Sequence, residues 1–132
     1  MPPLEFVNSG QSWPPHYTFS PAVRKGNLLF ISGLTGADAQ GNIVEKGDIV
    51  AQTRRIFEKI KAILEAAVGS LDDVVQTTDY ITTTENYRGT ADVRREFFRH
   101  PFPAATGVVV KELLRRDALI EIDAVAVLDG AK

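Results

Sequence analysis

An amphipathic pattern over residues 48–69 constrains the fold of this chain more than any other feature. Charged side chains occupy one side of the pattern, and the other side carries a stripe formed by Ile49, Thr53, Ile56, Phe57, Ile60, Ile63, Leu64 and Ala67. This spacing predicts a helix that buries one face. Asp48 suits its N-cap, and Gly69 is expected to stop it. The apolar stripe needs another apolar surface to pack against.

Strand patterns surround this helix and supply that surface. Two short segments, 22–24 and 28–31, flank a Gly26-Asn27 turn and predict a hairpin. Later segments rich in β-branched residues predict further strands, and an amphipathic segment ended by prolines predicts a second helix. These later elements are strands at about 74–83, 106–111 and 118–128 and a helix at 86–98.

The element order predicted for the chain is β-β-β-α-β-α-β-β, which is typical of an α+β fold. We expect a single mixed β-sheet with two helices on one face. The opposite face still carries apolar side chains, and another copy of the chain is the simplest cover for it. At 132 residues the chain is expected to be a single domain, with residues 1–18 as an N-terminal loop or arm.

Composition narrows the classes of function. The chain has no cysteine, which excludes disulfides, a cysteine nucleophile and thiolate metal sites. A net charge of −2 gives no electrostatic basis for binding nucleic acid. No apolar run approaches the ~20 residues of a membrane span, and the N-terminus lacks the basic and apolar regions of a signal peptide. We therefore expect a cytoplasmic protein with neither nucleic-acid nor membrane partners.

Several motifs together resemble the Rid family, also called the YjgF or reactive-intermediate deaminase family. They are GNLLFISG at 26–33, Gln52, DDVV at 72–75 with Thr78, Tyr87, FF at 97–98, PA at 103–104 and IEIDA at 120–124. The resemblance covers about residues 19–127. It implies a chorismate-mutase-like α+β subunit and a homotrimer, in which the sheets face a central core and three sites lie in clefts between neighbours.

The best-known activity of the family is hydrolysis of enamines and imines to a ketone and ammonia. In such members an arginine clamps the substrate carboxylate, a serine-glycine turn and a glutamate line the pocket, and a tyrosine lies near the water. The resemblance assigns these roles to Ser32, Gly33 and Glu121, but Ala105 holds the place of the arginine and Phe19 that of the tyrosine. Because alanine cannot grip a carboxylate, we expect a substrate other than a simple 2-imino acid.

Glu121 is the principal catalytic candidate. Strand alternation directs Glu121 and Asp123 to one face and Ile120 and Ile122 to the other. Glu121 is either a solvated carboxylate or, as the resemblance implies, a cleft carboxylate whose pKa partial burial would raise, suiting it to proton transfer with water. Asp123 is the weaker candidate, and a lysine or arginine is its expected partner.

Ser32-Gly33 has two interpretations. In the first, the serine hydroxyl and backbone N–H groups face a ligand oxygen. In the second, the pair is only a turn that needs a flexible glycine. No histidine is placed to activate Ser32, so covalent catalysis is not expected. His16 and His100 lie far apart in the sequence, so no metal site is expected either.

The loop before the first predicted hairpin offers replacements for the altered positions. Tyr17 lies two residues before Phe19 and is a candidate catalytic phenol, and His16 and Trp13 in the same loop are candidate substrate-binding residues. The alternative is a surface loop whose aromatic residues pack on a neighbouring subunit.

Several cations are candidates to replace the missing clamp. They are Arg24, Lys25, Arg88, Arg94, Arg95, Lys111, Arg115 and Arg116. Arg88 is the first choice because it follows Tyr87 at the family's cleft side. Thr106 remains beside Ala105, and with Gly107 this leaves a smaller, less polar wall that suits a bulkier or neutral substrate.

Two functional hypotheses follow from these residues. The first is a small-molecule hydrolase, similar to enamine and imine deaminases, that adds water to a C=N or related activated bond in an intersubunit cleft. It needs neither metal nor cofactor because an iminium carbon is already electrophilic. The alternative is a non-catalytic homotrimer that binds a small molecule as a sensor or carrier.

Overall fold

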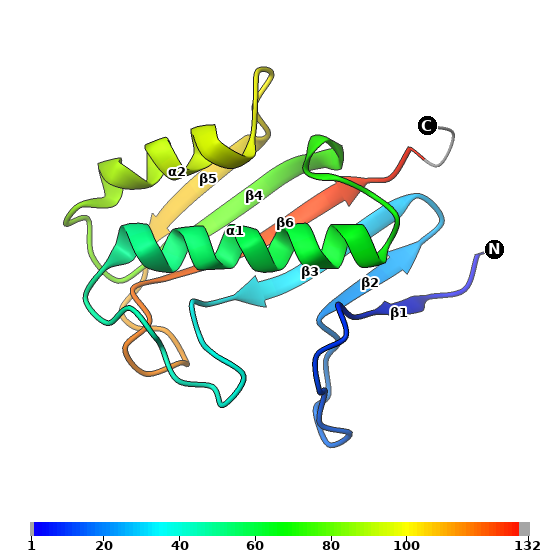
Figure 1. Cartoon of the computed structure of the whole chain (residues 1–132), viewed down its shortest axis with the longest axis horizontal. Helices are drawn as coiled ribbons and strands as arrows, with labels where there is room; N and C mark the ends of the chain where they lie inside the picture. The colour runs from blue at the N-terminus through cyan, green and yellow to red at the C-terminus, as the bar shows by residue number, and fades with distance from the viewer. Residues whose placement is uncertain (1, 130–132) are drawn as a thin grey trace.

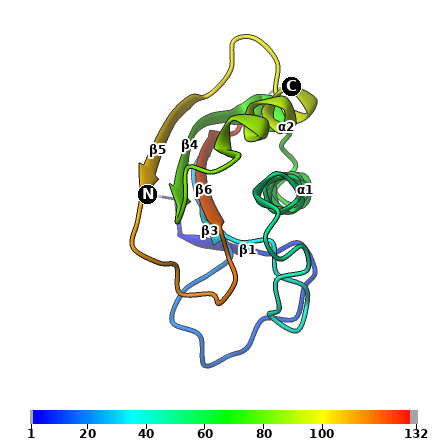
Figure 2. The ribbon, with the colours of Figure 1, turned by 90° about the vertical axis from the view of Figure 1, so that its left-hand side faces the viewer.

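The computed structural model describes residues 2–129, which form one six-stranded sheet with two helices against it (Figure 1). The strands are β1 (Glu5–Val7), β2 (Ala22–Lys25), β3 (Leu28–Leu34), β4 (Val74–Ile81), β5 (Ala104–Val109) and β6 (Ile120–Val127). The helices are α1 (Ile49–Ala66) and α2 (Thr90–Phe97). Both helices lie on the same side of the sheet (Figure 2). The predicted α+β class and element order are confirmed.

The spatial order of the strands is β1-β2-β3-β6-β4-β5. Only β5 runs parallel to its neighbour among these pairs, and the connection between β4 and β5 passes through α2. The chain therefore places its last strand, β6, in the middle of the sheet between β3 and β4. A residue on β6 thus has neighbours from both halves of the sequence.

Some element boundaries differ from the sequence prediction. The N-terminal arm contains a three-residue strand, β1, which pairs with β2 and which is too short to show an alternating pattern. The predicted second helix starts as a 3₁₀ turn at Tyr87–Gly89 before α2 begins. Strand β5 starts two residues earlier than expected because its pairing with β4 already begins at Ala104.

The core lies between α1 and the sheet. Ile56, Phe57 and Ile60 on α1 are fully buried, and Leu29 on β3 and Ile122 on β6 meet them from the sheet. These side chains belong to the predicted stripe and strands, so burial of their apolar area supplies the main driving force for this packing.

A buried polar residue, Gln52, ties two loops to the same helix. Its side-chain amide donates to the carbonyl oxygens of Glu45 and Asp117, and its carbonyl accepts from the N–H of Leu119. Buried polar groups of this kind are stabilising only when they are satisfied, as Gln52 is. The loop before α1 and the loop before β6 are thereby held side by side.

The face of the sheet away from the helices carries exposed apolar side chains. Leu28 and Phe30 on β3 lie opposite Val127 and Val125 on β6, and Leu28, Phe30 and Val127 are each more than a third exposed. Every residue of β5 is exposed as well. This agrees with the predicted uncovered sheet face.

The end of α1 differs from the prediction that Gly69 stops it. The left-handed residue is Val68, with φ of 60°, and its N–H donates to the carbonyl oxygen of Glu65. Gly69 has a tight surrounding of its own, because a Cβ there would lie 2.6 Å from the end of the Leu128 side chain, which would have to move. A β-branched residue in the left-handed region is strained, and the strain is about 1–2 kcal/mol.

Val68→Gly is therefore expected to raise the free energy of unfolding by about 1 kcal/mol, since glycine adopts this conformation freely but loses more backbone entropy on folding. Val68 is 93% exposed, so no packing is lost with its side chain. Urea denaturation at one fixed protein concentration measures the change. Val68→Ala, which keeps a Cβ, should gain less, and an unfolding midpoint that falls in the glycine variant would contradict the assignment of strain.

Candidate functional site

A groove of about 410 Å³ lies at the end of β3 and brings together segments that are distant in sequence. It is lined by Phe19, Ser32, Gly33, Thr35, Leu114, Arg115 and Glu121. Five of these residues were singled out from the sequence: Phe19, Ser32, Gly33, Arg115 and Glu121. The groove is therefore the candidate site, and the loop before β6 completes it.

A β-bulge shapes the floor of the groove. Ile31 pairs with Ala124 and Leu34 pairs with Ile122, so Ser32 and Gly33 together face the single residue between those partners. A bulge of this kind bends a strand and re-aims its side chains, and bulges are frequent beside active sites. The expected serine-glycine turn is thus an irregularity within β3.

Glu121 is the second residue of β6 and projects onto the open face of the sheet, directly across from Tyr80 on β4. Its carboxylate lies against Gly33, where any Cβ would collide with it. Glu121 is partly buried, and this burial, followed by the nearby charge of Asp123, raises the pKa of its carboxyl group. A carboxylate with a raised pKa is well suited to exchange a proton with water near neutral pH.

Asp123 has a different partner from the expected lysine or arginine. The phenol of Tyr80 donates to a carboxylate oxygen of Asp123 over 3.0 Å, and this hydrogen bond is the largest cause of the raised pKa of Tyr80. Within residues 2–129 no lysine or arginine pairs with Asp123, which shares the face of Glu121, and its charge contributes to the raised pKa of Glu121.

Ser32 is anchored rather than free. Its hydroxyl donates to the carbonyl oxygen of Ser20 over 2.6 Å, and its N–H donates to that of Pro21 over 3.0 Å. Its backbone N–H is therefore not available to a ligand oxygen, which corrects one part of the expected role. The hydroxyl oxygen still has a lone pair with which to accept a hydrogen bond from a ligand N–H.

The aromatic loop reaches the groove through one residue only. The indole N–H of Trp13 donates to the carbonyl oxygen of Phe19 over 3.0 Å, Tyr17 stacks on Phe19 at 5.3 Å, and the ring of His16 meets Tyr17 edge-on. Among these four residues only Phe19 lines the groove. In this single chain Trp13 and Tyr17 pack against Phe19, and His16 packs against Tyr17.

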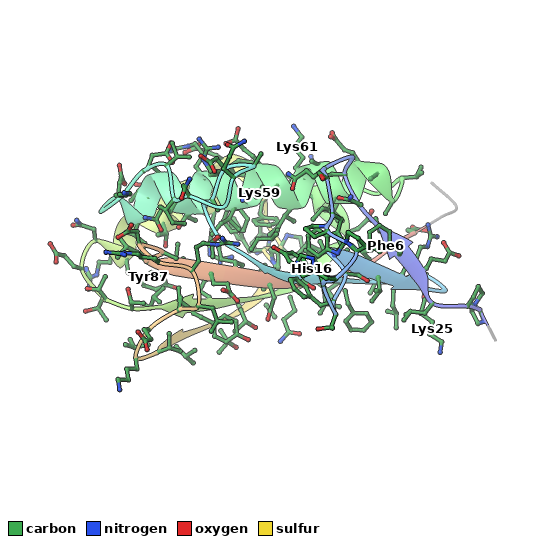
Figure 3. The ribbon with its side chains drawn as sticks, turned by 90° about the horizontal axis from the view of Figure 1, so that it is seen from below. Phe6, His16, Lys25, Lys59, Lys61 and Tyr87 are labelled. Carbon is green, nitrogen blue, oxygen red and sulfur yellow. The ribbon has the colours of Figure 1, made fainter. Side chains whose placement is uncertain are left out.

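The remaining candidates lie elsewhere on the chain. Ala105 and Thr106 pair with Thr77 and Thr78 on β4, and Tyr87 lies against Gly107 on the helix side of the sheet. Figure 3 shows Tyr87 and His16 well separated along the molecule.

Arg88 lines a different pocket, formed by Gly47, Asp48, Ile49, Val50, Asn86 and Gly89. Arg88 therefore does not replace the clamp in the groove of its own chain. A single chain does not unite the two groups of candidate residues.

Arg94 also proves to have another role. Its guanidinium donates to Asp79 over 2.8 Å and to the hydroxyl of Thr77 over 3.1 Å, and it lies over the ring of Phe57. Asp79 is 1% exposed and also accepts a hydrogen bond from Tyr87. Burial, and then this bond, raise the pKa of Tyr87 to about 12. Arg94 is therefore a structural cation.

Arg115 lines the groove, although the sequence favoured Arg88. Its guanidinium donates to the carbonyl oxygen of Gly41 over 2.9 Å. The only signal in the sequence was its position in the polar segment directly before the strand that carries Glu121. Which of several loop cations faces the groove depends on how Gln52 holds that loop, and sequence spacing does not report this.

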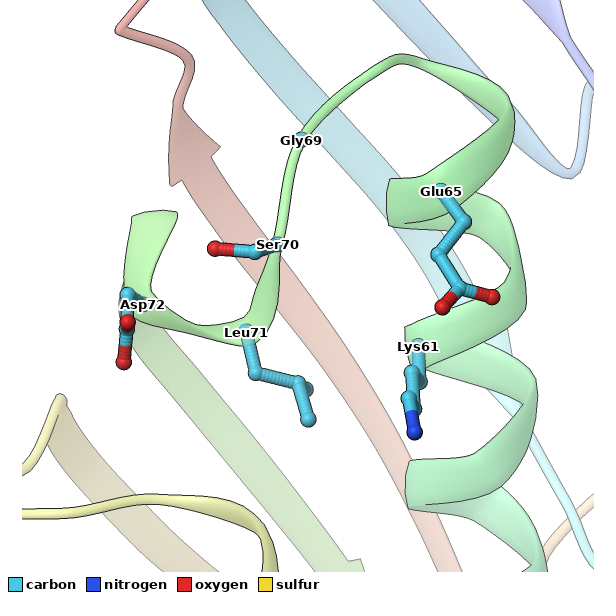
Figure 4. A pocket seen from close by; sticks show the side chains of 6 residues that line it. All are labelled: Lys61, Glu65, Gly69, Ser70, Leu71 and Asp72. Carbon is cyan, nitrogen blue, oxygen red and sulfur yellow. The ribbon is translucent and has the colours of Figure 1, made fainter. Parts of the chain in front are cut away.

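Another pocket, of about 230 Å³, lies at the C-terminal end of α1 (Figure 4). Lys61 and Glu65 line it from α1, and Asp72 on the opposite rim pairs with Arg99. Its polar groups do not converge on one point, so it is a weaker candidate. Within residues 2–129 there is no cluster of histidine and carboxylate side chains that could hold a metal ion, and no helix there is long and apolar enough to cross a membrane.

Comparison with known proteins identifies the family. The family model described as "Endoribonuclease L-PSP" matches residues 10–128. The chain belongs to this family, the Rid/YjgF family. The structure of this Rid protein is similar to the crystal structure of RidA from an Antarctic Psychrobacter species, with a TM-score of 0.82 and 31% identity over 94% of this chain and 99% of that one.

Two curated relatives carry more specific names. A 2-iminobutanoate/2-iminopropanoate deaminase of Dermatophagoides farinae is 31% identical over 98% of this chain and all of the relative. A 3-aminoacrylate deaminase, RutC, of Acinetobacter baylyi is 36% identical over 94% of this chain and 98% of the relative. This Rid chain thus has relatives named as imine and enamine deaminases.

Proposed function

We propose that this Rid protein hydrolyses the C=N bond of a small imine, or of an enamine that tautomerises to one, in the groove beside Glu121. The observation that carries the proposal is the partly buried Glu121 carboxylate, with its raised pKa, lying against Gly33 in a groove that also contains Ser32. The names of the relatives support the same class of reaction.

Glu121 moves the proton in this reaction. In its carboxylate form it accepts a proton from water while the water oxygen attacks the imine carbon, and the C=N electron pair moves to nitrogen. Glu121 then returns the proton to the nitrogen, which gives a carbinolamine. In the second half of the reaction Glu121 takes the proton of the carbinolamine hydroxyl group and delivers it to the nitrogen as the C–N bond breaks and the C=O bond forms, so ammonia leaves and Glu121 ends as a carboxylate. The balance is imine plus water to ketone plus ammonia. Ser32 holds the substrate nitrogen by accepting a hydrogen bond from its N–H group.

A homotrimer belongs to the same proposal. The exposed apolar face around Leu28, Phe30 and Val127 would be buried against neighbouring copies. The exposed strand β5 would then lie beside the groove of another subunit. In that arrangement Ala105, Thr106, Tyr87 and Arg88 would approach the groove from a neighbour. Sedimentation velocity tests this directly: a species three times the 14.5 kDa of one chain supports it, and a monomer opposes it. The cytoplasmic location and the direct roles of Tyr17, His16 and Trp13 remain predictions.

Ammonia release tests the proposed reaction. Freshly generated imines and enamines, both with and without a carboxylate, are mixed with the protein, and free ammonia is followed against a buffer blank. Release that is faster than the blank and proportional to protein concentration supports hydrolysis. A ligand that binds and is recovered unchanged would contradict it and favour a carrier.

Gly33→Ala is expected to lower kcat/KM about 10²-fold, because the added Cβ displaces the Glu121 carboxylate and misplacement of a reacting group by about 1 Å has an effect of this size. The matched control is Gly10→Ala, where a Cβ would meet nothing within 4 Å, although Gly10 has a positive φ. Steady-state kinetics on the best substrate compare the two. Equal activity of Gly33→Ala and the wild type would show that Glu121 does not need this position.

A further inference from the structure

The groove contains a cation that nothing above uses. Among the residues that line the groove, Glu121 is the only carboxylate and Arg115 is the only cation. Within residues 2–129 no carboxylate lies within 4.0 Å of the Arg115 guanidinium, and its hydrogen bond to Gly41 engages one nitrogen only. A guanidinium has five N–H donors, so several remain directed elsewhere.

Of the other arginines in residues 2–129, Arg24, Arg88 and Arg116 lack a carboxylate partner but do not line the groove, and the remaining five pair with carboxylates. The pairs are Arg54–Glu96, Arg55–Glu45, Arg94–Asp79, Arg95–Asp92 and Arg99–Asp72. Arg115 differs from them because its anchor is a neutral carbonyl group, which leaves its charge uncompensated at short range. An arginine that lines a groove and lacks an anionic partner is suited to bind a carboxylate ligand through a bidentate contact.

The turn at residues 38–42, whose Gly41 carbonyl oxygen accepts from Arg115, is itself held by hydrogen bonds. A carboxylate oxygen of Asp38 accepts from the N–H groups of Gln40 and Asn42, and the N–H of Gly41 donates to the carbonyl oxygen of Asp38. Gly41 has a φ of +85°, and a Cβ there would lie 2.5 Å from the Arg115 guanidinium. The turn therefore presents its carbonyl group to Arg115 and leaves room for the guanidinium.

The charge of Arg115 also affects the pKa of a neighbouring cation, Lys59. The ammonium group of Lys59 donates to the carbonyl oxygen of Thr35, a residue that lines the same groove. Burial first, and then the charges of Arg55 and Arg115, lower the pKa of Lys59 to about 8. Arg115 and Lys59 are thus two cations near this wall of the groove, with Asp38 acting on Lys59 in the opposite direction, and a cation at the wall favours an anion there.

We propose that Arg115 binds the carboxylate of the substrate in this groove and takes the place of the arginine that is absent at Ala105. The inference rests on the proposed function and deepens it. It names the substrate class as imines or enamines that carry a carboxylate, and it replaces the expected neutral substrate. Glu121 and Arg115 line the same groove and are not ion-paired to each other, so the reacting C=N bond lies beside Glu121 and the carboxylate beside Arg115.

Ligand binding tests this inference without relying on turnover. The probe is 2-oxobutanoate, the ketone that hydrolysis of 2-iminobutanoate yields, and its neutral methyl ester is the comparison ligand. Arg115→Ala is expected to raise the Kd for 2-oxobutanoate about 10- to 100-fold and to leave binding of the ester unchanged, because a charge-assisted contact to carboxylate is lost. Arg115→Lys keeps the charge but loses the planar guanidinium that makes a bidentate contact. Its Kd for 2-oxobutanoate should lie between those of the wild type and Arg115→Ala.

Arg116→Ala is the matched control, since it makes the same change in net charge one residue further along the loop and does not line the groove. Thermal unfolding of each variant verifies that the fold is retained. Equal loss in Arg115→Ala and Arg116→Ala, or loss for acid and ester alike, would overturn a specific carboxylate contact.

Kinetics separate this inference from the proposed function. If the protein releases ammonia and Arg115→Ala raises KM for carboxylate substrates with little change in kcat, both stand. If ammonia is released but Arg115→Ala leaves KM unchanged, the Arg115 inference fails alone. If no ammonia is released while Arg115 still governs the affinity for 2-oxobutanoate, the hydrolase proposal fails, and the carboxylate site stands.

Discussion

Glu121→Gln is expected to lower kcat/KM for imine hydrolysis about 10²- to 10⁴-fold, the range over which a positioned general base contributes. Glutamine keeps the shape and partial burial of the side chain but cannot accept the proton from water. The measurement is ammonia release on the best substrate. Glu112→Gln, on the exposed loop before β6, is the matched control and should retain full activity.

The pH profile identifies Glu121 as the base. Burial, then Asp123, raise the pKa of Glu121, so the acid limb of kcat/KM should lie above the ordinary glutamate value of 4.5. Asp123→Asn removes a negative charge and should move this limb toward lower pH without abolishing it. An acid limb that persists unchanged in Glu121→Gln would assign the base to another residue.

Glu121→Gln should raise the stability of the protein at neutral pH although it lowers the activity. The folded-state pKa of Glu121 is raised above its unfolded value, so its contribution to stability is complete below the unfolded pKa and is lost as pH rises through the folded pKa. Glutamine has no such loss, and Glu121→Gln should therefore unfold at a higher temperature than the wild type at pH 7. Near pH 4 and below, this advantage should shrink.

Arg94→Met is expected to lower the free energy of unfolding by about 3–5 kcal/mol, because it leaves the carboxylate of Asp79 buried without its cation. Such a loss is a large part of the 5–15 kcal/mol that is typical of folded domains. Equilibrium unfolding in urea, at one protein concentration, measures it.

Two further variants separate the ion pair from the loss of packing. Asp79→Asn with Arg94→Met removes the charge while keeping an acceptor for Tyr87, and this double variant should be more stable than Arg94→Met alone. Arg95→Met breaks the exposed pair with Asp92 next to it, and its cost should be below about 1 kcal/mol. If Arg94→Met cost no more than Arg95→Met, the buried pair would not be coupled to stability.

Much of the fold was accessible from the sequence because local patterns and global packing agree here. The stripe on α1 and the β-branched run of β4 each have the period of the element they form. The predicted order includes a third strand before the first helix, but the sequence did not place this strand, β1, at any residues, and it did not predict the left-handed Val68. Strand β1 is too short to carry a periodic signal, and the conformation of Val68 depends on backbone geometry that valine normally avoids.

The candidate site was predicted less completely than the fold. Ser32, Gly33 and Glu121 were identified and do share one groove. Arg88 was preferred over Arg115 because it follows Tyr87 in the sequence, yet the structure places Arg88 at another pocket. The choice depends on long-range contacts, namely the hydrogen bonds from Gln52 and from Arg115 to loops far from them in sequence.

The sequence by itself determined the α+β class, the main helix and the identity of the groove's acid, since each follows from periodicity or from residue type at a matched position. Only the tertiary structure decided which cation lines the groove with that acid, how Ser32 is anchored and why Gly33 has no side chain. These depend on which atoms approach one another across β3, β6 and two loops. Such contacts join residues up to 74 positions apart, as Gly41 and Arg115 are, and they arise only when the sheet closes around its last strand.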